Sequence, residues 1–314
     1  MFMMICIYFF HIKGEAMSLQ KYEILLKAVE TGSLTKVGEQ LNLTQSAVSH
    51  AISSLEQELG LTLLIRNRSG VRLTSSGERL IPYFQGILQL KERLYQEIAL
   101  IKGLVAGTVK LGVFSSVSIQ WLPGMVKAFN SKFPHIEVKL YDGHYQEIEQ
   151  WLATGQVDLG FVSLPTLQPL DVTELKKDRM LCVLPPGHAL AGQSSICLDQ
   201  IINEPFIIPI SGCDTDVRRI FMKYKGPLNI KYELENDHVI MSMVEQGLGI
   251  SILPEMVLAQ MPYNLCLRPL EGEHYRTIGL AAISRDNLSP AAAKMFQFIT
   301  ERIHASSDLT CDSA

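Results

Sequence analysis

Five hydrogen-bonding side chains are concentrated on one short segment of the chain: Gln45, Ser46, Ser49, His50 and Ser53. Apolar residues recur among them at i, i+4 and i+7, as Val48, Ile52 and Leu55, which predicts a helix with one buried face and one polar face. A glutamine side chain can bond bidentately to adenine, and a serine hydroxyl can bond to several bases. Short side chains also let a helix sit deep in the major groove. The pattern therefore predicts a helix whose polar face contacts base edges of DNA.

Three arginines, Arg66, Arg68 and Arg72, follow this helix, and no acidic residue lies between Glu58 and Glu78 to neutralise them. A local cluster of uncompensated cations suits contact with phosphate groups. Such contacts give affinity for nucleic acid without choosing a base sequence. We expect these three side chains to hold the DNA backbone.

The segments around these side chains predict a winged helix-turn-helix. Ser33 and Thr35 begin one of its helices, where they could also contact phosphate, although capping alone explains Ser33. The predicted elements are a helix over 19–31, a helix over 34–41 capped by Ser33, a turn at 42–43, a helix capped by Thr44 and ended by Gly60, and a small β-wing within 61–73.

A long helix is predicted after the wing. The run Ser75-Ser76-Gly77-Glu78 has capping-box spacing, and the helical pattern continues to about Lys102, a length of roughly 40 Å. Its apolar residues alternate steps of four and three, which makes a heptad seam with one polar member, Lys91. We expect the seam to pack against a second copy of the helix; the alternative is that it covers its own domain. The seam is Leu80, Phe84, Ile87, Lys91, Leu94, Ile98 and Ile101.

Beyond a hinge at 103–107, short β-rich runs alternate with amphipathic segments, which predicts βαβ units and a parallel sheet. Ligands bind beyond the carboxyl ends of such strands. The first such end is 114–118, where hydroxyls precede a helix and suit an anion, most simply a carboxylate. The predicted strands are 109–114, 136–140, 159–162, 206–210, 230–234 and 250–253, and the predicted helices are 120–133, 145–154, 216–225, 239–246 and 289–304.

Composition limits the class of protein. A chain of 314 residues is long enough for two or three domains. The net charge of −4 excludes a protein that is basic throughout, and residues 17–106 carry only two more cations than anions. DNA contact must therefore depend on local clusters rather than on bulk charge.

The six cysteines are scattered without metal-ligand spacing, which predicts a reduced, cytoplasmic protein with no metal and no cofactor. The apolar run at the N-terminus is too short to span a bilayer and lacks the features of a signal peptide, so no membrane association is expected. Codons for Lys13-Gly14-Glu15 can contain a ribosome-binding sequence just before Met17. We hypothesise that residues 1–16 are an N-terminal tail produced by a mis-called start, which intact mass of the native protein would test.

From Met17 to about His304 the chain resembles the LysR-type transcriptional regulators. Four positions depart from the common pattern of that family: His50 stands where Arg is common, Ala51 where Gln is common, Ser46 where Pro is frequent and Leu64 where Phe is frequent. The matching residues are Gly32-Ser33-Leu34-Thr35, Leu41, Gln45, Ala47-Val48-Ser49, Ile52, Leu55-Glu56, Leu59-Gly60, Leu63, Arg66, Leu73-Thr74, Gly77, Gly112, Leu122-Pro123, Phe129, Pro134, Gly155, Asp158, Gly247-Leu248-Gly249-Ile250 and Leu253-Pro254.

The resemblance implies an α/β protein with an N-terminal winged helix-turn-helix, a long linker helix and a two-lobed effector-binding domain. That domain would be like a periplasmic binding protein and built of Rossmann-like α/β subdomains. The implied divisions are a tail at 1–16, the winged helix-turn-helix at 17–75, the linker and dimerisation helix at 76–106, the effector domain at 107–306 and a tail at 307–314, with lobe I at about 107–167 and 267–306 and lobe II at about 168–266.

The implied function is transcription regulation, not catalysis. The partners implied are double-stranded operator DNA, a small and anionic metabolite between the lobes, a second copy through the linker helix, a homotetramer and RNA polymerase. The expected DNA-binding residues are Ser33, Thr35, Thr44, Gln45, Ser46, Ser49, His50, Ser53, Arg66, Arg68 and Arg72. The expected effector-binding residues are Ser115, Ser116, His144, Ser163, Ile210 and Ser211.

Two other functions compete with this interpretation. A redox-sensing regulator would need an accessible Cys213 with another thiol, such as Cys197, near enough to pair. A solute-binding protein would fit residues 108–306 alone, but it would leave the N-terminal motif unexplained. An enzyme is disfavoured, because no catalytic motif stands in a fitting context.

Overall fold

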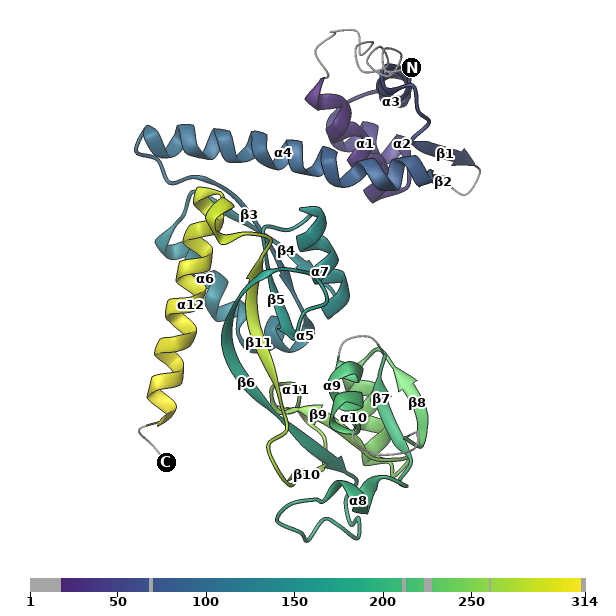
Figure 1. The fold of residues 1–314 in the computed structure, drawn as a ribbon, viewed down its shortest axis with the longest axis vertical. Coiled ribbons are helices and arrows are strands. Elements are labelled where there is room, and N and C mark those ends of the chain that lie inside the picture. Colours follow the sequence, from purple (N-terminus) through teal and green to yellow (C-terminus); the bar gives the residue numbers. More distant parts are fainter. Residues whose placement is uncertain (1–17, 68–69, 211–212, 223–227, 260, 312–314) are drawn as a thin grey trace, which may run out of the picture. The chain divides into compact units, whose positions relative to one another are not determined.

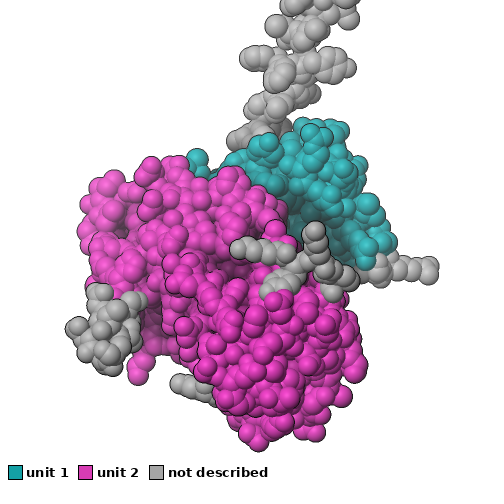
Figure 2. Space-filling model, turned by 60° about the horizontal axis from the view of Figure 1, so that its bottom comes forward, with its two compact units in different colours: residues 1–95 teal, residues 96–314 magenta. Residues whose placement is uncertain are grey.

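The computed structural model describes residues 18–67, 70–210, 213–222, 228–259 and 261–311. The chain divides into two compact units between Tyr95 and Gln96 (Figures 1 and 2). The N-terminal tail and its proposed start at Met17 lie outside the described residues.

Unit 1 is a winged helix-turn-helix, as the sequence predicted. Its core is formed by the apolar faces of the helices, in which Leu25, Ile52 and Leu55 are fully buried. The ring of Phe84 stacks on Tyr22 with centroids 4.6 Å apart. The elements are α1 (Leu19–Thr31), α2 (Leu34–Leu41), α3 (Gln45–Leu59), and the antiparallel pair β1 (Leu64–Asn67) and β2 (Gly70–Leu73).

Local hydrogen bonds set the limits of the two central helices. The Thr44 hydroxyl accepts from the N–H of Ala47 at 3.1 Å and so caps α3. Asn42 ends α2 with a φ of 54°, a left-handed conformation that asparagine tolerates better than most residues. The wing docks at the junction of α1 and α2, where the N–H of Val71 donates to the carbonyl of Gly32 at 3.0 Å. A Cβ at Gly70 would lie 2.7 Å from the same carbonyl oxygen, so only glycine fits there.

The long helix α4 (Ser75–Ile101) begins with a different cap from the one predicted. The hydroxyl of Thr74, not that of Ser75, accepts from the N–H of Gly77 at 3.0 Å. The same hydroxyl donates to the carbonyl of Thr62 at 2.7 Å, which ties the helix start to the wing. Sequence spacing alone favoured Ser75, because it does not show that the hydroxyl of Thr74 also bonds to Thr62.

The two ends of the heptad seam of α4 differ in burial. Its first members pack into unit 1, where Phe84 is 4% exposed. Lys91 is not an isolated polar member of the seam, because its ammonium lies 2.7 Å from the carboxylate of Glu23 on α1. Farther along, Leu94 and Ile101 are 57% and 84% exposed. The alternative expectation, that α4 covers its own domain, therefore holds only for the start of the seam.

Unit 2 contains a seven-stranded sheet in the order β10-β6-β11-β5-β3-β4, with β9 also paired to β6, and a separate two-stranded sheet, β7-β8. The sequence predicted a parallel sheet, and the sheet is mixed. The pairs β3–β4, β3–β5 and β7–β8 are parallel, but β6 and β11 run antiparallel to their neighbours. The strands are β3 (Gly107–Val113), β4 (Ile136–Asp142), β5 (Leu159–Leu164), β6 (Asp171–Leu184), β7 (Phe206–Pro209), β8 (Ile230–Leu234), β9 (Ser251–Pro254), β10 (Cys266–Pro269) and β11 (Tyr275–Ala282).

The strand β6 connects the two lobes of unit 2. As far as Arg179 it pairs with β11, and from Met180 onward it pairs with β9 and β10. The sequence analysis did not predict this strand, because charged residues fill its middle and only its end, at 180–184, is a run of apolar residues. We therefore propose that the chain passes from lobe I to lobe II between Arg179 and Met180 of β6, rather than at residue 168. It returns to lobe I in the segment between β10 and β11.

Helices cover both lobes. In lobe I, α6 and α12 lie on one face of the sheet and α7 lies on the other (Figure 1). The helix predicted over 120–133 is α6, and a separate short helix, α5, precedes it and ends before Trp121. None of the described helices has the length and hydropathy needed to cross a bilayer. The helices are α5 (Ser115–Gln120), α6 (Leu122–Lys132), α7 (Tyr145–Thr154), α8 (Leu198–Ile201), α9 (Cys213–Ile220), α10 (Asp237–Glu245), α11 (Glu255–Leu258), the 3-10 helix η1 (Arg285–Asn287) and α12 (Pro290–Cys311).

Candidate nucleic-acid interface and interlobe pocket

The polar face of α3 lies at the surface of unit 1. Its opposite face is fully buried through Val48, Ile52 and Leu55. The hydroxyl groups of Thr44 and Ser46, at the N-terminus of the helix, lie 3.0 Å apart and bond to each other. The predicted base-contacting residues Gln45, Ser46, His50 and Ser53 are exposed, and Ser49 is half-buried.

The wing and α3 are joined by one arginine. The Nη1 atom of Arg66 donates to the hydroxyl of Ser49 at 2.6 Å, and its Nη2 atom donates to Ser53 at 3.3 Å. Arg66, which the sequence predicted as a phosphate contact, is bonded to α3 in the single chain, and its contact with phosphate stays a prediction. This arginine holds two of the predicted base-contacting hydroxyls against the wing.

The other residues predicted to contact phosphate differ in exposure. Arg72 and Thr35 are exposed, whereas Ser33 is half-buried and its hydroxyl accepts from the N–H of Lys36 at 3.5 Å. Arg68 lies outside the described residues. Arg66 of β1 and Arg72 of β2 are thus two exposed cations of the wing, and Arg66 also joins the wing to α3.

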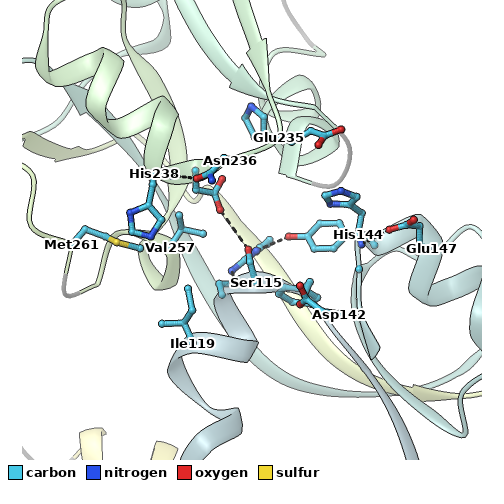
Figure 3. A pocket seen from close by; sticks show the side chains of 17 residues that line it. Ser115, Ile119, Asp142, His144, Glu147, Glu235, Asn236, His238, Val257 and Met261 are labelled. Atoms are coloured by element: carbon cyan, nitrogen blue, oxygen red, sulfur yellow. Dashed lines mark hydrogen bonds between the residues drawn. The ribbon is translucent and has the colours of Figure 1, made fainter. Parts of the chain in front are cut away.

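A pocket of about 510 Å³ lies between the lobes of unit 2 (Figure 3). Lobe I contributes the start of α5 and the loop between β4 and α7, and lobe II contributes the end of β7, the start of α10 and the region of α11. Its lining consists of residues 114–116, 119, 142–145 and 147 from lobe I, of residues 209, 235–238, 257 and 261 from lobe II, and of Arg276 at the start of β11.

Three of the six predicted effector residues, Ser115, Ser116 and His144, line this pocket. Ser163 is buried in β5 and does not line it. Ile210 is 41% exposed and is absent from the lining, where its neighbour Pro209 takes part. Ser211 lies outside the described residues. The strand ends reach the pocket as expected, but Ser163 and Ile210 do not.

Arg276 is the main residue that the sequence did not reveal. Its side chain is fully buried, and its guanidinium lies 2.7 Å from the carboxylate of Asp178, its cross-strand partner on β6. It also donates to the hydroxyls of Tyr145 and Ser116, and it lies 5.3 Å from the ring centroid of Phe114. One charged residue at the start of an apolar strand was the only signal in the sequence.

This buried pair ties the lobes together at the crossing. The second carboxylate oxygen of Asp178 accepts from the N–H of Met256, at the start of α11, at 3.1 Å. Arg276 reaches Ser116 and Tyr145 in lobe I through its other nitrogens. The arginine thereby uses the Ser116 hydroxyl that we had expected to serve a ligand.

Two carboxyl groups of lobe II have raised pKa values. Burial raises the pKa of Asp216, on α9, from its ordinary value of 3.8 to about 6, although Arg276 and Arg219 act in the opposite direction. Burial also raises the pKa of Asp237, while Arg276 and a hydrogen bond from Ser115 oppose that shift. The bond from the Ser115 hydroxyl to Asp237 is 3.5 Å long and crosses between the lobes (Figure 3).

The described cysteines give little support to a redox role. Burial raises the pKa of the Cys182 thiol to about 12, which suppresses the reactive thiolate. Cys197 and Cys266 are partly exposed and free. The side chain of Cys213, on which the redox hypothesis depended, is outside the described part of the structure. Within that part, no group of three or more His, Cys, Asp or Glu side chains could hold a metal ion.

Comparison with known proteins matches both units. The family of bacterial regulatory helix-turn-helix proteins, lysR family, matches residues 19–78, and the LysR substrate binding domain matches residues 102–303. The uncharacterised HTH-type transcriptional regulator YvbU of Bacillus subtilis is 36% identical over 89% of this chain and 96% of its own. The probable HTH-type transcriptional regulator LrrA of Synechococcus elongatus is 35% identical over 85% of this chain and 91% of its own.

Solved structures share the fold. Full-length OxyR from Pseudomonas aeruginosa superposes with a TM-score of 0.75 at 20% identity, covering 92% of this chain and 95% of its own. Full-length CbnR, solved in complex with its target DNA, superposes with a TM-score of 0.64 at 17% identity, covering 91% of this chain and 99% of its own. The agreement extends over both units of the chain.

Proposed function

Because this chain belongs to the LysR family of DNA-binding transcriptional regulators, we propose that it recognises an operator through α3 and the wing, under the control of a small molecule bound in the interlobe pocket. The observation that carries the DNA part of this proposal is the exposed polar face of α3, joined to the wing by Arg66. That arrangement presents base-reading hydroxyls and a cation on one surface.

The roles of the side chains follow from their chemistry. Gln45, Ser49 and His50 contact base edges in the major groove and give sequence preference. Arg72 and Thr35, together with Arg68, contact phosphates and give affinity that depends on salt. Thr44 and Ser33 act chiefly by capping α3 and α2.

The exposed half of the α4 seam supports a dimer. Leu94, Ile98 and Ile101 are 57%, 38% and 84% exposed in the single chain. Apolar side chains at heptad spacing lower their free energy by packing against an equivalent helix. A dimer through α4 also presents two copies of α3 to two half-sites of an operator. A homotetramer, and contact with RNA polymerase, extend this proposal by family resemblance.

The pocket supports control by a small molecule. Its volume is about 510 Å³, and residues of both lobes line it, so a ligand there favours one arrangement of the lobes over another. The sequence suggested a small anion, such as a carboxylate, beside Ser115 and Ser116. That expectation loses support from the lining, because Ser116 already accepts from Arg276. A regulator that acts on chromosomal DNA in this way works in the cytoplasm.

A footprint of the gene's own upstream region, recorded with and without a panel of metabolites, tests the proposal. We expect protection of a site with two-fold symmetry, and a change in its extent or affinity with one class of metabolite. Ser49→Ala should weaken binding to that site more than binding to random DNA. Absence of any protected site in the upstream region or in the surrounding intergenic DNA would contradict the proposal.

A further inference from the structure

The one guanidinium in the lining of the pocket is already bonded. The Arg276 side chain is 0% exposed, and its nitrogens donate to Asp178, Tyr145 and Ser116. A ligand carboxylate would have to displace one of these buried bonds. Displacing Asp178 would leave a carboxylate that is 1% exposed without its cation, which is costly. The remaining basic side chains of the lining are the imidazoles of His144 and His238.

Carboxylates face the same pocket from both lobes. Asp142 and Glu147 come from lobe I, and Glu235 and Asp237 come from lobe II. Figure 3 shows Asp142 and Glu147 on one side of the pocket and Glu235 on the other. The pocket therefore carries four carboxylates, two imidazoles and one arginine, and that arginine is paired with Asp178. Its electrostatic potential attracts cations.

The bonds that these carboxylates make are with neutral donors. Asp142 accepts from the Ser118 hydroxyl at 3.2 Å, and Asp237 accepts from the Ser115 hydroxyl at 3.5 Å. Glu147 accepts from the backbone N–H of His144 at 2.9 Å. Among the residues that the structure describes, no lysine or arginine forms an ion pair with any of the four acids. Arg276 and the imidazoles of His238 and His144 act on Asp237 electrostatically, and a ligand cation in the pocket would add to their effect.

The rest of the lining is apolar and suits a hydrocarbon body. Phe114, Ile119, Val257 and Met261 line the pocket between the acids. The side chain of Ile119 is 53% exposed and gains from being covered. A ligand with one charged end and a short apolar body would satisfy both parts of the lining.

From this lining we infer that the pocket takes a small organic cation, with an ammonium group held between Asp237 and Glu235 of lobe II and Asp142 of lobe I, and with an apolar body against Ile119 and Met261. The inference rests on the proposed function, which assigns the pocket to an effector, and it replaces the anion expected from the sequence. A cation between acids of both lobes also couples binding to lobe position. Without it, the carboxylates repel one another as the lobes approach; with it, the closer arrangement is favoured.

Three probes with one hydrocarbon skeleton test the charge class: cyclohexylmethylamine, cyclohexylmethanol and cyclohexanecarboxylate. Binding to the full chain is measured by titration calorimetry at constant ionic strength and pH. We expect the amine to bind and the alcohol and carboxylate to bind at least about tenfold more weakly. Tighter binding of the carboxylate, or binding of none of the three, would overturn the inference. So would an equal heat signal from magnesium ion alone.

Two variants locate the binding site. Asp237→Asn keeps an acceptor for Ser115 but removes the charge, and Glu235→Gln removes the charge of an exposed side chain. Each should weaken the amine by about tenfold, whereas Asp199→Asn, an exposed acid of α8 outside the pocket, should leave its affinity unchanged. Undiminished amine binding in both pocket variants would overturn the placement.

The same preparations are tested for binding to the protected upstream DNA. Operator binding that persists while the amine fails to bind rejects the cation but leaves the proposed regulator standing. Loss of a specific footprint in the unaltered chain contradicts the proposed function itself. The two failures are therefore distinguishable.

Discussion

The DNA-facing side of unit 1 and the pocket of unit 2 hold their polar side chains in opposite ways. On α3, residues within one helix point outward, and Gln45 and His50 are exposed to water. In the pocket, the groups come from segments far apart in the chain, and Arg276 and Asp178 are 1% exposed. On the first surface, the water on the side chains can be exchanged for DNA at little cost to the fold. In the second region, Arg276 and Asp178 have already lost their water, and their charges compensate each other inside the protein.

Because of this difference, substitutions on α3 should change DNA binding, whereas substitutions at the base of the pocket should change stability. A polar side chain removed from α3 should alter recognition while the unit stays folded, because surface substitutions rarely change stability by much. A charged side chain removed from the base of the pocket should unfold unit 2 before any ligand is considered. Arg66 lies between these cases, because it is exposed but bonded to Ser49 and Ser53.

The largest effect should come from Arg276→Ala. We expect it to lower the free energy of unfolding of unit 2 by about 3–5 kcal/mol, because Asp178 would remain buried without a partner. Both tryptophans, Trp121 and Trp151, lie in unit 2, so their fluorescence during urea unfolding reports on that unit. The matched control is Arg285→Ala.

Arg285 also forms an ion pair with an aspartate of β6, Asp171, at 2.8 Å, but its side chain is 50% exposed. Its removal should cost about 0–1 kcal/mol. Similar losses for the two arginine variants would show that burial does not distinguish the pairs, and the comparison of the two regions would fail.

Ser49→Ala should weaken specific DNA binding by about 1–3 kcal/mol and leave the urea midpoint of unit 2 unchanged. Because Arg66 donates to this hydroxyl, the double variant with Arg66→Ala measures how far the two act together. Titration of operator and random DNA by fluorescence anisotropy gives both losses. Equal losses on the two DNAs would refute a base-contacting role for Ser49.

The pH dependence of stability should reveal Asp216. Its pKa in the folded protein is about 6, above its ordinary value of 3.8, so the folded state disfavours the ionised carboxylate. That penalty is present above about pH 6, and it disappears as pH falls through this range towards the pKa of the unfolded state. Wild type should therefore gain about 1 kcal/mol relative to Asp216→Asn between pH 7 and pH 5. Parallel stability curves for the two proteins would contradict the raised pKa.

Arg72→Ala should have the smallest effect on discrimination. We expect it to weaken operator and random DNA alike, and to reduce the slope of log affinity against log salt concentration by about 1. The unfolding curve should not change, because the side chain is exposed. A loss confined to the operator would show that Arg72 reads bases rather than phosphates.

The sequence predicted unit 1 well because its signals are local. Ser33 and Thr44 mark helix starts, Gly60 marks a helix end, and the buried residues of α3 recur at helical spacing. Each of these effects acts within a turn or two of the chain. The cap of α4 was assigned to the wrong residue because Thr74 is held by Thr62 on the other side of the wing.

Unit 2 was predicted only where strands are short and apolar. β6 was missed because charged residues fill its middle, although its end at 180–184 is apolar. The sheet was expected to be parallel because the antiparallel strands β6 and β11 were not among the predicted strands. Ser163 and Ile210 were placed near a ligand on the rule of strand ends, but that rule does not say which side chains the neighbouring elements cover.

By itself the sequence determined the helix-turn-helix, the wing, the heptad seam and the family of the chain, because propensity, capping and period are set by neighbours along the backbone. Only the tertiary structure decided the chemistry of the pocket. Arg276 lies 98 residues from Asp178 and 160 from Ser116, and these contacts exist only after β6 and β11 have paired. A charge that is neutralised by a distant partner reads in the sequence like any other charge, so the acidic character of the pocket emerges only in the folded chain.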